Sequence, residues 1–240
     1  MLSWIRGEKT KSQAPELALG LPDGEDWVAF PWTVVDQMRR LISRMGRKEA
    51  PPSRLSFVAA LRQEGVTYVS WAYATTLAYD VKTSVCIVDL NWWWPSELSR
   101  KVPDCGGLAA VLTKQTTLGQ ATVNSGIPNL TILPAGELSL HERALFSRST
   151  ILKETIMELA ARYDHLVLDI PSVLASPDAI PLASLGDACC FVIHQGVTSL
   201  TDVKTALSDL DHLPQMGAVM NKFHLNTPRL IQRFVDPYSP

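Results

Sequence analysis

The chain has 240 residues, which is enough to bury the core of one α/β domain. Hydrophobic residues make up 46% and charged residues 19%, which excludes a disordered chain, and the formal net charge of −2 argues against a general nucleic-acid surface. No apolar run approaches the length of a membrane span and the N-terminus lacks a signal-peptide core, so we expect a cytoplasmic protein that meets a membrane only through a partner.

The first 30 residues are rich in Gly, Pro, Lys, Glu and Asp, and we expect residues 1–30 to form a flexible N-terminal arm. Residues 31–240 then form a single domain. A helix is predicted at residues 34–45, with Val34, Met38, Leu41 and Met45 on one face.

Apolar runs without alternation are typical of strands covered on both faces. They occur at residues 55–60, 84–89, 130–133, 165–169, 189–193 and 216–220. Helical segments lie between most of them, at residues 67–79, 108–112, 149–163 and 199–210. This alternation predicts an α/β fold with a doubly wound, mostly parallel sheet and helices on both faces. Cys86, Cys189 and Cys190 lie inside such runs without metal-ligand spacing, so we expect buried free thiols.

Residues 55–67 have the strand, loop and helix order of a phosphate-binding P-loop. In a P-loop, backbone N–H groups surround the phosphates at a helix N-terminus, a Lys reaches the β/γ-phosphates, and a Ser or Thr hydroxyl holds Mg²⁺. Gly65 and Thr67 occupy the expected positions, but Val66 stands at the lysine position.

Asp89 and Asp169 each end an apolar strand. Because ligands of open α/β sheets bind outside the carboxyl ends of strands, we expect Gly65, Asp89 and Asp169 to converge on one crevice. An Asp after a strand also serves as a simple cap, so a structural role for either residue stays open.

Five motifs together resemble the cytoplasmic tyrosine-kinase domains of bacterial capsule and exopolysaccharide synthesis, the BY-kinases, which are relatives of the partition and septum-site ATPases. Residues 62–67 (RQEGVT) resemble the family's Pro-Gly-Glu-Gly-Lys-Ser/Thr loop, and residues 87–96 (IVDLNWWWPS) its second acidic motif. Residues 126–130 (GIPNL) with 133–136 (LPAG) are the most specific match. Residues 163–172 (YDHLVLDIPS) resemble the Walker B region, and residues 218–221 (AVMN) the late strand of the family. The resemblance covers about residues 34–223.

The resemblance implies a site for ATP or ADP with Mg²⁺. Thr67 would coordinate Mg²⁺ together with the carboxylates of Asp89 and Asp169, which would also be the catalytic acids. Asn221 would face the adenine edge, and Gly65 would let the loop backbone approach phosphate.

The chain departs from the family at the residues that carry charge. Val66 replaces the phosphate lysine, Leu61 the early signature lysine of the partition-type relatives, and Asn91 the second acid of the middle motif. The tail holds one tyrosine, Tyr238, where the kinases hold a cluster. Arg62 either stands in for the missing lysine or is an exposed loop residue.

Trp92, Trp93 and Trp94 follow one another in a predicted loop. Either one or two of them are buried, or the run is an exposed aromatic patch for a partner. Taken together, these features predict a degenerate tyrosine-kinase-like subunit that regulates or scaffolds polysaccharide production, with weak or lost nucleotide binding.

The expected partner is a membrane polysaccharide co-polymerase or chain-length regulator, with a homo-oligomer as a further expectation and no nucleic acid. An active ATPase or tyrosine autokinase of the same pathway and a partition-type positioning ATPase remain as alternatives.

Overall fold

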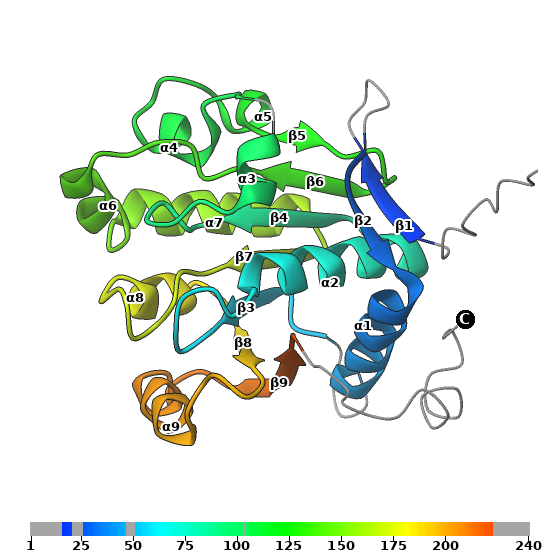
Figure 1. Cartoon of the computed structure of the whole chain (residues 1–240). Helices are drawn as coiled ribbons and strands as arrows, with labels where there is room; N and C mark the ends of the chain where they lie inside the picture. Colours follow the sequence, from blue (N-terminus) through cyan, green and yellow to red (C-terminus); the bar gives the residue numbers. More distant parts are fainter. Residues whose placement is uncertain (1–15, 21–25, 47–50, 103, 223–240) are drawn as a thin grey trace, which may run out of the picture.

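The computed structural model describes residues 16–20, 26–46, 51–102 and 104–222 (Figure 1). Its centre is a seven-stranded sheet in the order β5-β6-β4-β7-β3-β8-β9, in which neighbouring strands are parallel except for the antiparallel β5. The strands are β3 (Arg54–Val58), β4 (Val85–Asp89), β5 (Val123–Asn124), β6 (Leu130–Leu133), β7 (His165–Asp169), β8 (Ala188–His194) and β9 (Gln215–Asn221). The predicted mostly parallel sheet is confirmed.

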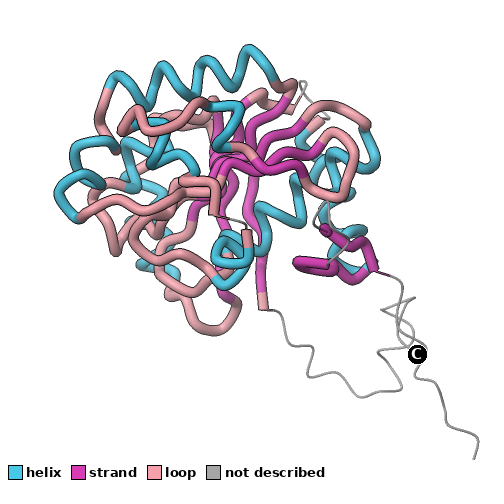
Figure 2. Tube along the Cα trace, turned by 90° about the horizontal axis from the view of Figure 1, so that it is seen from above, coloured by secondary structure: helices cyan, strands magenta, loops and turns pink. Residues whose placement is uncertain are grey.

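Helices cover both faces of the sheet, as the view from above shows (Figure 2). One face carries α1 (Trp32–Met45) and α2 (Val66–Val81), and the other carries α4 (Gly107–Leu112), α5 (Leu118–Ala121), α7 (Thr150–Arg162), α8 (Ala179–Ala183) and α9 (Leu200–Asp209). Two short helices, α3 (Glu97–Lys101) and α6 (Leu140–Phe146), lie in connections. Among the described helices, none has both the length and the apolar character that a bilayer crossing needs.

The strand β4 shows why its apolar run does not alternate. Val85 and Ile87 are buried in the core beneath α1 and α2, whereas Cys86 and Val88 are buried in the core beneath α7. Both faces of the strand are therefore covered, so every position needs an apolar side chain. The predicted free thiols are also present: Cys86, Cys189 and Cys190 are buried and unbridged, and burial raises the pKa of Cys189 to about 11.

The N-terminal segment differs from the expected arm. Strands β1 (Glu16–Gly20) and β2 (Asp26–Pro31) form an antiparallel pair beside α1. Phe30 is fully buried and meets the Tyr68 ring of α2 edge to face, with 5.3 Å between ring centroids. Residues 1–15 and 21–25 lie outside the described residues, so the arm remains a prediction there, and the domain boundary at residue 30 also remains one.

Candidate functional site

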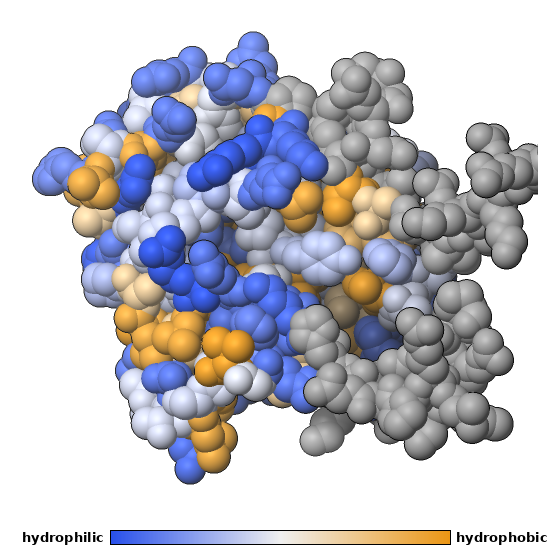
Figure 3. Space-filling model, in the orientation of Figure 1, coloured by the Kyte–Doolittle hydropathy of each residue, from blue (hydrophilic) through white to orange (hydrophobic). Residues whose placement is uncertain are grey.

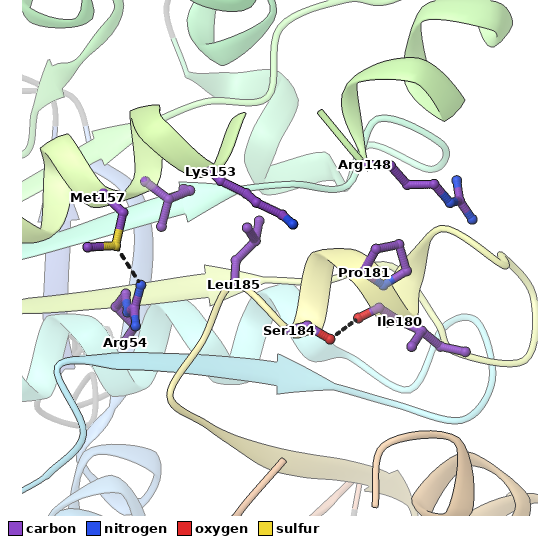
Figure 4. Close-up of a pocket in the computed structure, with 9 residues that line it drawn as sticks. Arg54, Arg148, Lys153, Met157, Ile180, Pro181, Ser184 and Leu185 are labelled. Atoms are coloured by element: carbon purple, nitrogen blue, oxygen red, sulfur yellow. Dashed lines mark hydrogen bonds between the residues drawn. The ribbon is translucent and has the colours of Figure 1, made fainter. Parts of the chain in front are cut away.

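Two clefts are candidates for the functional site. The larger cleft has a volume of about 1060 Å³ and lies at the carboxyl ends of the central strands. It is lined by residues 61–68, by residues of the loop 91–96, which we call the tryptophan loop, and by α3. The smaller, of about 680 Å³, lies between α7 and α8 (Figure 4).

The two arginines of the smaller cleft are paired within the chain. The guanidinium of Arg54 is paired with Asp187 and also donates to the Met157 sulfur at 3.1 Å, and Arg148 is paired with Asp178. The rest of the lining is largely apolar, with Ile180, Pro181 and Leu185 beside Lys153 (Figure 4). The larger cleft instead contains the loop residues 61–68 and the Ser172 hydroxyl, which is buried and has no partner among the described residues, so we take the larger cleft as the candidate site.

The loop between β3 and α2 keeps two left-handed positions, at Gln63 with φ of +64° and at Gly65 with φ of +92°. A Cβ on Gly65 would lie 2.2 Å from the Asn221 amide nitrogen, so only glycine fits there. Gln63 stands where the resembling loop has its first glycine, and a left-handed conformation costs a non-glycine residue about 1–2 kcal/mol. Gln63 therefore holds a left-handed backbone conformation that glycine adopts easily and that a side chain disfavours.

Two successive residues at the end of β9 hold this loop. The Asn221 amide nitrogen donates to the Glu64 carbonyl at 2.8 Å, and the Lys222 ammonium donates to the Gln63 carbonyl at 2.8 Å. The Asn221 side-chain nitrogen thus binds the loop, and the contact of Asn221 with a base stays a prediction. Lys222 had no signal in the sequence, because it reaches the loop from 159 residues away.

Glu64 fastens the same loop to β8. Its side chain is buried, and its carboxylate accepts hydrogen bonds from the Leu61 N–H at 2.9 Å, from the His194 N–H at 3.3 Å and from the Thr198 hydroxyl. Sequence reasoning gave this residue no role. The signal in the sequence was an acidic residue next to the turn-forming Gly65, because polar side chains in turns often accept hydrogen bonds from nearby backbone N–H groups.

Asp89 and Asp169 lie opposite each other in the parallel pairing of β4 and β7, and both are fully buried. Asp89 Oδ1 accepts the Asn91 N–H at 2.9 Å. Within the described residues, Asp89 Oδ2, both oxygens of Asp169 and the Ser172 hydroxyl have no hydrogen-bond partner. The fold thus brings the two acids together, but the larger cleft is lined by Gly65 and by their neighbours Asn91 and Ile170 and not by either acid, so the convergence of all three predicted residues on one crevice stays a prediction.

Burial and mutual repulsion perturb both acids. Burial raises the pKa of Asp89, against the favourable Ser99 hydroxyl and Asn91 N–H. Burial also raises the pKa of Asp169 well above its usual value, and the charge of Asp89 adds to the increase, while the Thr67 hydroxyl opposes it. Carboxylate and hydroxyl oxygens are the ligands that Mg²⁺ takes, so unpartnered oxygens of Asp89 and Asp169 beside Thr67 fit this ion, which would supply the missing positive charge.

The tryptophans do not form one exposed patch. Trp92 is 2% exposed, and its indole nitrogen donates to the Ala135 carbonyl at 2.8 Å, so the patch interpretation is wrong for this residue. Trp93 and Trp94 are half-buried and line the cleft. The Asn91 side chain separates the three rings by bending residues 91–94 into a turn. Its amide nitrogen donates to the Trp94 carbonyl and its amide oxygen accepts from the Trp94 N–H, both at 3.1 Å.

Arg62 is an exposed loop residue, which is the second of the two sequence-based alternatives. Its guanidinium lies over the Trp94 ring, 4.4 Å from the centroid, at the edge of the cleft. Other cations of the lining come from elements that the motifs did not single out: Arg100 and Lys101 of α3 and Lys222 after β9. Hydrophilic side chains gather around α3 and around the loop on this face (Figure 3). This positive lining suits an anionic ligand.

Comparison with known proteins points in the same direction as the site. No family model matches the chain. The tyrosine-protein kinase YwqD of Bacillus subtilis (strain 168) is 32% identical over 117 residues, which cover 48% of this chain and 49% of that protein. The succinoglycan biosynthesis transport protein ExoP of Rhizobium meliloti (strain 1021) is 25% identical over 182 residues, or 72% of this chain and 22% of that protein. The chain thus spans half or less of the length of these two relatives.

Solved structures share the fold. The kinase domain of VpsO superposes with a TM-score of 0.72 at 22% identity, over 80% of this chain and 96% of that one. The septum site-determining protein MinD of Pyrococcus horikoshii OT3, complexed with Mg-ADP, gives a TM-score of 0.58 at 23% identity, over 76% of each chain. The fold is that of the P-loop NTPases.

Proposed function

We propose that this chain, which belongs to the bacterial tyrosine-kinase family, is a regulatory or scaffold subunit in the production or export of a capsular or exopolysaccharide. It binds a membrane polysaccharide co-polymerase from the cytoplasmic side, and its nucleotide site is weakened. The relatives support the pathway, because they include tyrosine kinases and a succinoglycan transport protein.

The observation that carries the regulatory role is Val66 at the lysine position of a loop that otherwise keeps its backbone. Phosphoryl transfer depends on positioning and charge neutralisation far more than on covalent chemistry of the protein. We expect that the nearby Arg62 does not replace the lysine, because its guanidinium is stacked on Trp94.

A working ATPase or tyrosine autokinase is the second candidate. The in-register pair of Asp89 and Asp169 favours it, because their unpartnered oxygens suit a metal ion beside Thr67. The third candidate, a partition-type positioning ATPase, has only the shared fold in its favour.

The two leading candidates are separated by complementation. Deleting the gene should reduce cell-surface polysaccharide, and a variant with Asp89→Asn and Asp169→Asn should restore it to the parent level, because a scaffold needs no catalytic acids. The matched control carries Asp209→Asn and Asp211→Asn, which change two exposed acids at the end of α9.

If the buried-acid variant is folded and fails where the control succeeds, the subunit is an enzyme. If deletion leaves the polysaccharide unchanged, the pathway assignment is wrong.

A further inference from the structure

The smaller cleft, between α7 and α8, is mostly apolar and separate from the candidate site. Ile156 and Leu185 are buried in its lining, and Ile180 and Pro181 of α8 are half-buried beside them (Figure 4). Met157 of α7 is 57% exposed and also lines it. None of the described residues that line this cleft also lines the larger one. An exposed methionine beside apolar side chains is typical of surfaces that bind a partner helix.

The charged part of the lining is cationic. It consists of Arg54, Arg148 and Lys153, and no acidic side chain is found among the described residues that line the cleft. The acids that pair with the two arginines, Asp187 and Asp178, lie outside the lining. Lys153 has neither an ion pair nor a side-chain hydrogen bond in the part of the chain that the structure describes. The cleft therefore keeps an unpaired positive charge, which suits an acidic ligand.

Two cations have donors left for such a ligand, and they stand about one helical turn apart. The Lys153 ammonium has three donors, and the Arg54 Nη1 atom donates to the Met157 sulfur, which is a weak acceptor. Residues 153 and 157 are about 6 Å apart along α7, because a helix rises about 1.5 Å per residue. Carboxylates at positions i and i+4 of a ligand helix have the same spacing. This row of charge favours a peptide with several acids over a ligand with a single charged head group.

We propose that the cleft between α7 and α8 binds an acidic amphipathic helix of the membrane partner. The apolar face of that helix packs on Ile180, Pro181 and Leu185, and two of its carboxylates, one turn apart, pair with Lys153 and Arg54. The inference rests on the proposed scaffold role and names the surface and the chemistry of the contact with the partner.

The probe is a synthetic peptide of about 18 residues, because shorter peptides form little helix in water. It carries leucines on one face and glutamates at positions i and i+4 beside them, and its binding to the full chain is measured by fluorescence anisotropy. A control peptide has the same composition with leucines and glutamates spread around the helix. The parent should bind the first peptide about tenfold or more tightly than the control, because only the first presents an apolar and an acidic side together.

Charge reversal tests whether this binding occurs in the cleft. Lys153→Glu should weaken binding of the first peptide about fivefold or more, because an attraction becomes a repulsion. A peptide with lysines in place of the glutamates should have the opposite preference and bind Lys153→Glu more tightly than the parent. The matched control is Lys204→Glu, which reverses the charge of an exposed lysine on α9 and should change the affinity less than about twofold.

The apolar wall has its own variant. Ile180→Ser should weaken binding of the glutamate peptide and of the lysine peptide alike, about fivefold or more, because both peptides bury their leucines on α8. Thermal unfolding of each variant without peptide checks that the fold is kept. Lys153 is exposed in the first turn of α7, where a glutamate is compatible with the helix, so at least this variant should unfold as the parent does.

The proposal is overturned if the parent does not distinguish the first peptide from the control peptide. It is also overturned if Lys153→Glu and Lys204→Glu change the binding equally, because the attraction would then come from net charge alone. Light scattering tests another occupant: a concentration-dependent dimer of the parent that Lys153→Glu abolishes would assign the cleft to a second copy of the chain and overturn the partner helix.

The deletion strain links the cleft to the scaffold role. Lys153→Glu should restore less cell-surface polysaccharide than Lys204→Glu does, and full restoration by Lys153→Glu would overturn the use of this cleft for the partner. A deletion that leaves the polysaccharide unchanged would overturn the proposed function instead. The peptide titrations do not depend on the cell, so the two failures are distinguishable.

Discussion

At the scale of single residues, the buried acid pair is the most strained feature of the site. Asp89 and Asp169 both have a raised pKa, so the folded protein holds these protons more tightly than the unfolded chain does. Stability from this pair is therefore greatest below the usual carboxyl pKa and is lost as the pH rises through the raised values. We expect the metal-free protein to be less stable at about pH 8 than at about pH 5.

Asp169→Asn should raise the free energy of unfolding at neutral pH and flatten this dependence, because it removes the repulsion. Urea unfolding between about pH 5 and about pH 8 without divalent metal measures both effects. Asp164→Asn is the control. Hydrogen bonds from Ser84 lower the pKa of the exposed Asp164, so the contribution of this residue to stability changes with pH in the opposite direction. An Asp169→Asn variant as dependent on pH as the parent would contradict the account.

Gln63 offers a second test at this scale. Its left-handed conformation is strained for a side chain, so Gln63→Gly should raise the free energy of unfolding by up to about 1 kcal/mol, after the larger backbone entropy of glycine in the unfolded chain is subtracted. Thermal and urea unfolding measure it, with Lys82→Gly as a matched control at another left-handed residue. A loss of stability in Gln63→Gly alone would mean that the glutamine side chain contributes contacts.

At the scale of elements, the tryptophan loop divides into a buried anchor and a cleft wall. Trp92 joins the core beside Ala135, so Trp92→Ala should destabilise the fold by about 3–5 kcal/mol. The pair Trp93→Ser and Trp94→Ser should cost less than about half of that, because both rings are half-buried. Urea unfolding of the two variants provides the comparison, and equal losses would place all three rings in the core.

Secondary structure was predictable where burial decided it. The central strands β3, β4 and β7 are covered on both faces, and that condition is visible as a mostly apolar run without alternation, interrupted in β3 only by the buried Ser56. The pair β1 and β2 was not predictable, because its strands are short and stand among Gly, Pro and charged residues. The helix α6 begins with a capping box at Ser139 and Glu142, a signal that its exposed, weakly apolar face obscured.

At the scale of the whole molecule, the motifs located the site but not its working parts. The carboxyl ends of parallel strands lie at one edge of a sheet, so the sequence placed Asp89 and Asp169 at the same edge, whereas their direct pairing depends on β4 and β7 being neighbours. The contacts of Lys222 and Asn221 with the loop depend on the position of β9 relative to the loop, which local patterns do not encode. The same is true of the stacking of Arg62 on Trp94.

The proposed weakening of the nucleotide site implies that adding a charged group there should recover binding before catalysis. Val66→Lys should increase the affinity for Mg-ADP roughly tenfold to hundredfold, as a charge-assisted hydrogen bond of about 1.5–3 kcal/mol implies. Its melting temperature without ligand should equal that of the parent, because residue 66 begins α2 and is only partly buried. Calorimetry and thermal unfolding measure the two effects, and an unchanged affinity would mean that the loop has lost its phosphate-binding shape.

Phosphoryl transfer should stay absent in the parent and recover less than binding in Val66→Lys. Asn91 replaces an acid of the resembling motif, and both polar ends of its side chain are engaged by the Trp94 backbone, so it cannot readily take over the work of a carboxylate. The tail also offers one tyrosine, Tyr238, which lies outside the described residues. Intact-mass and peptide mass spectrometry after incubation with Mg-ATP should therefore find no phosphotyrosine in the parent. Phosphorylation of Tyr238 in a large fraction of parent molecules would contradict this and favour the autokinase.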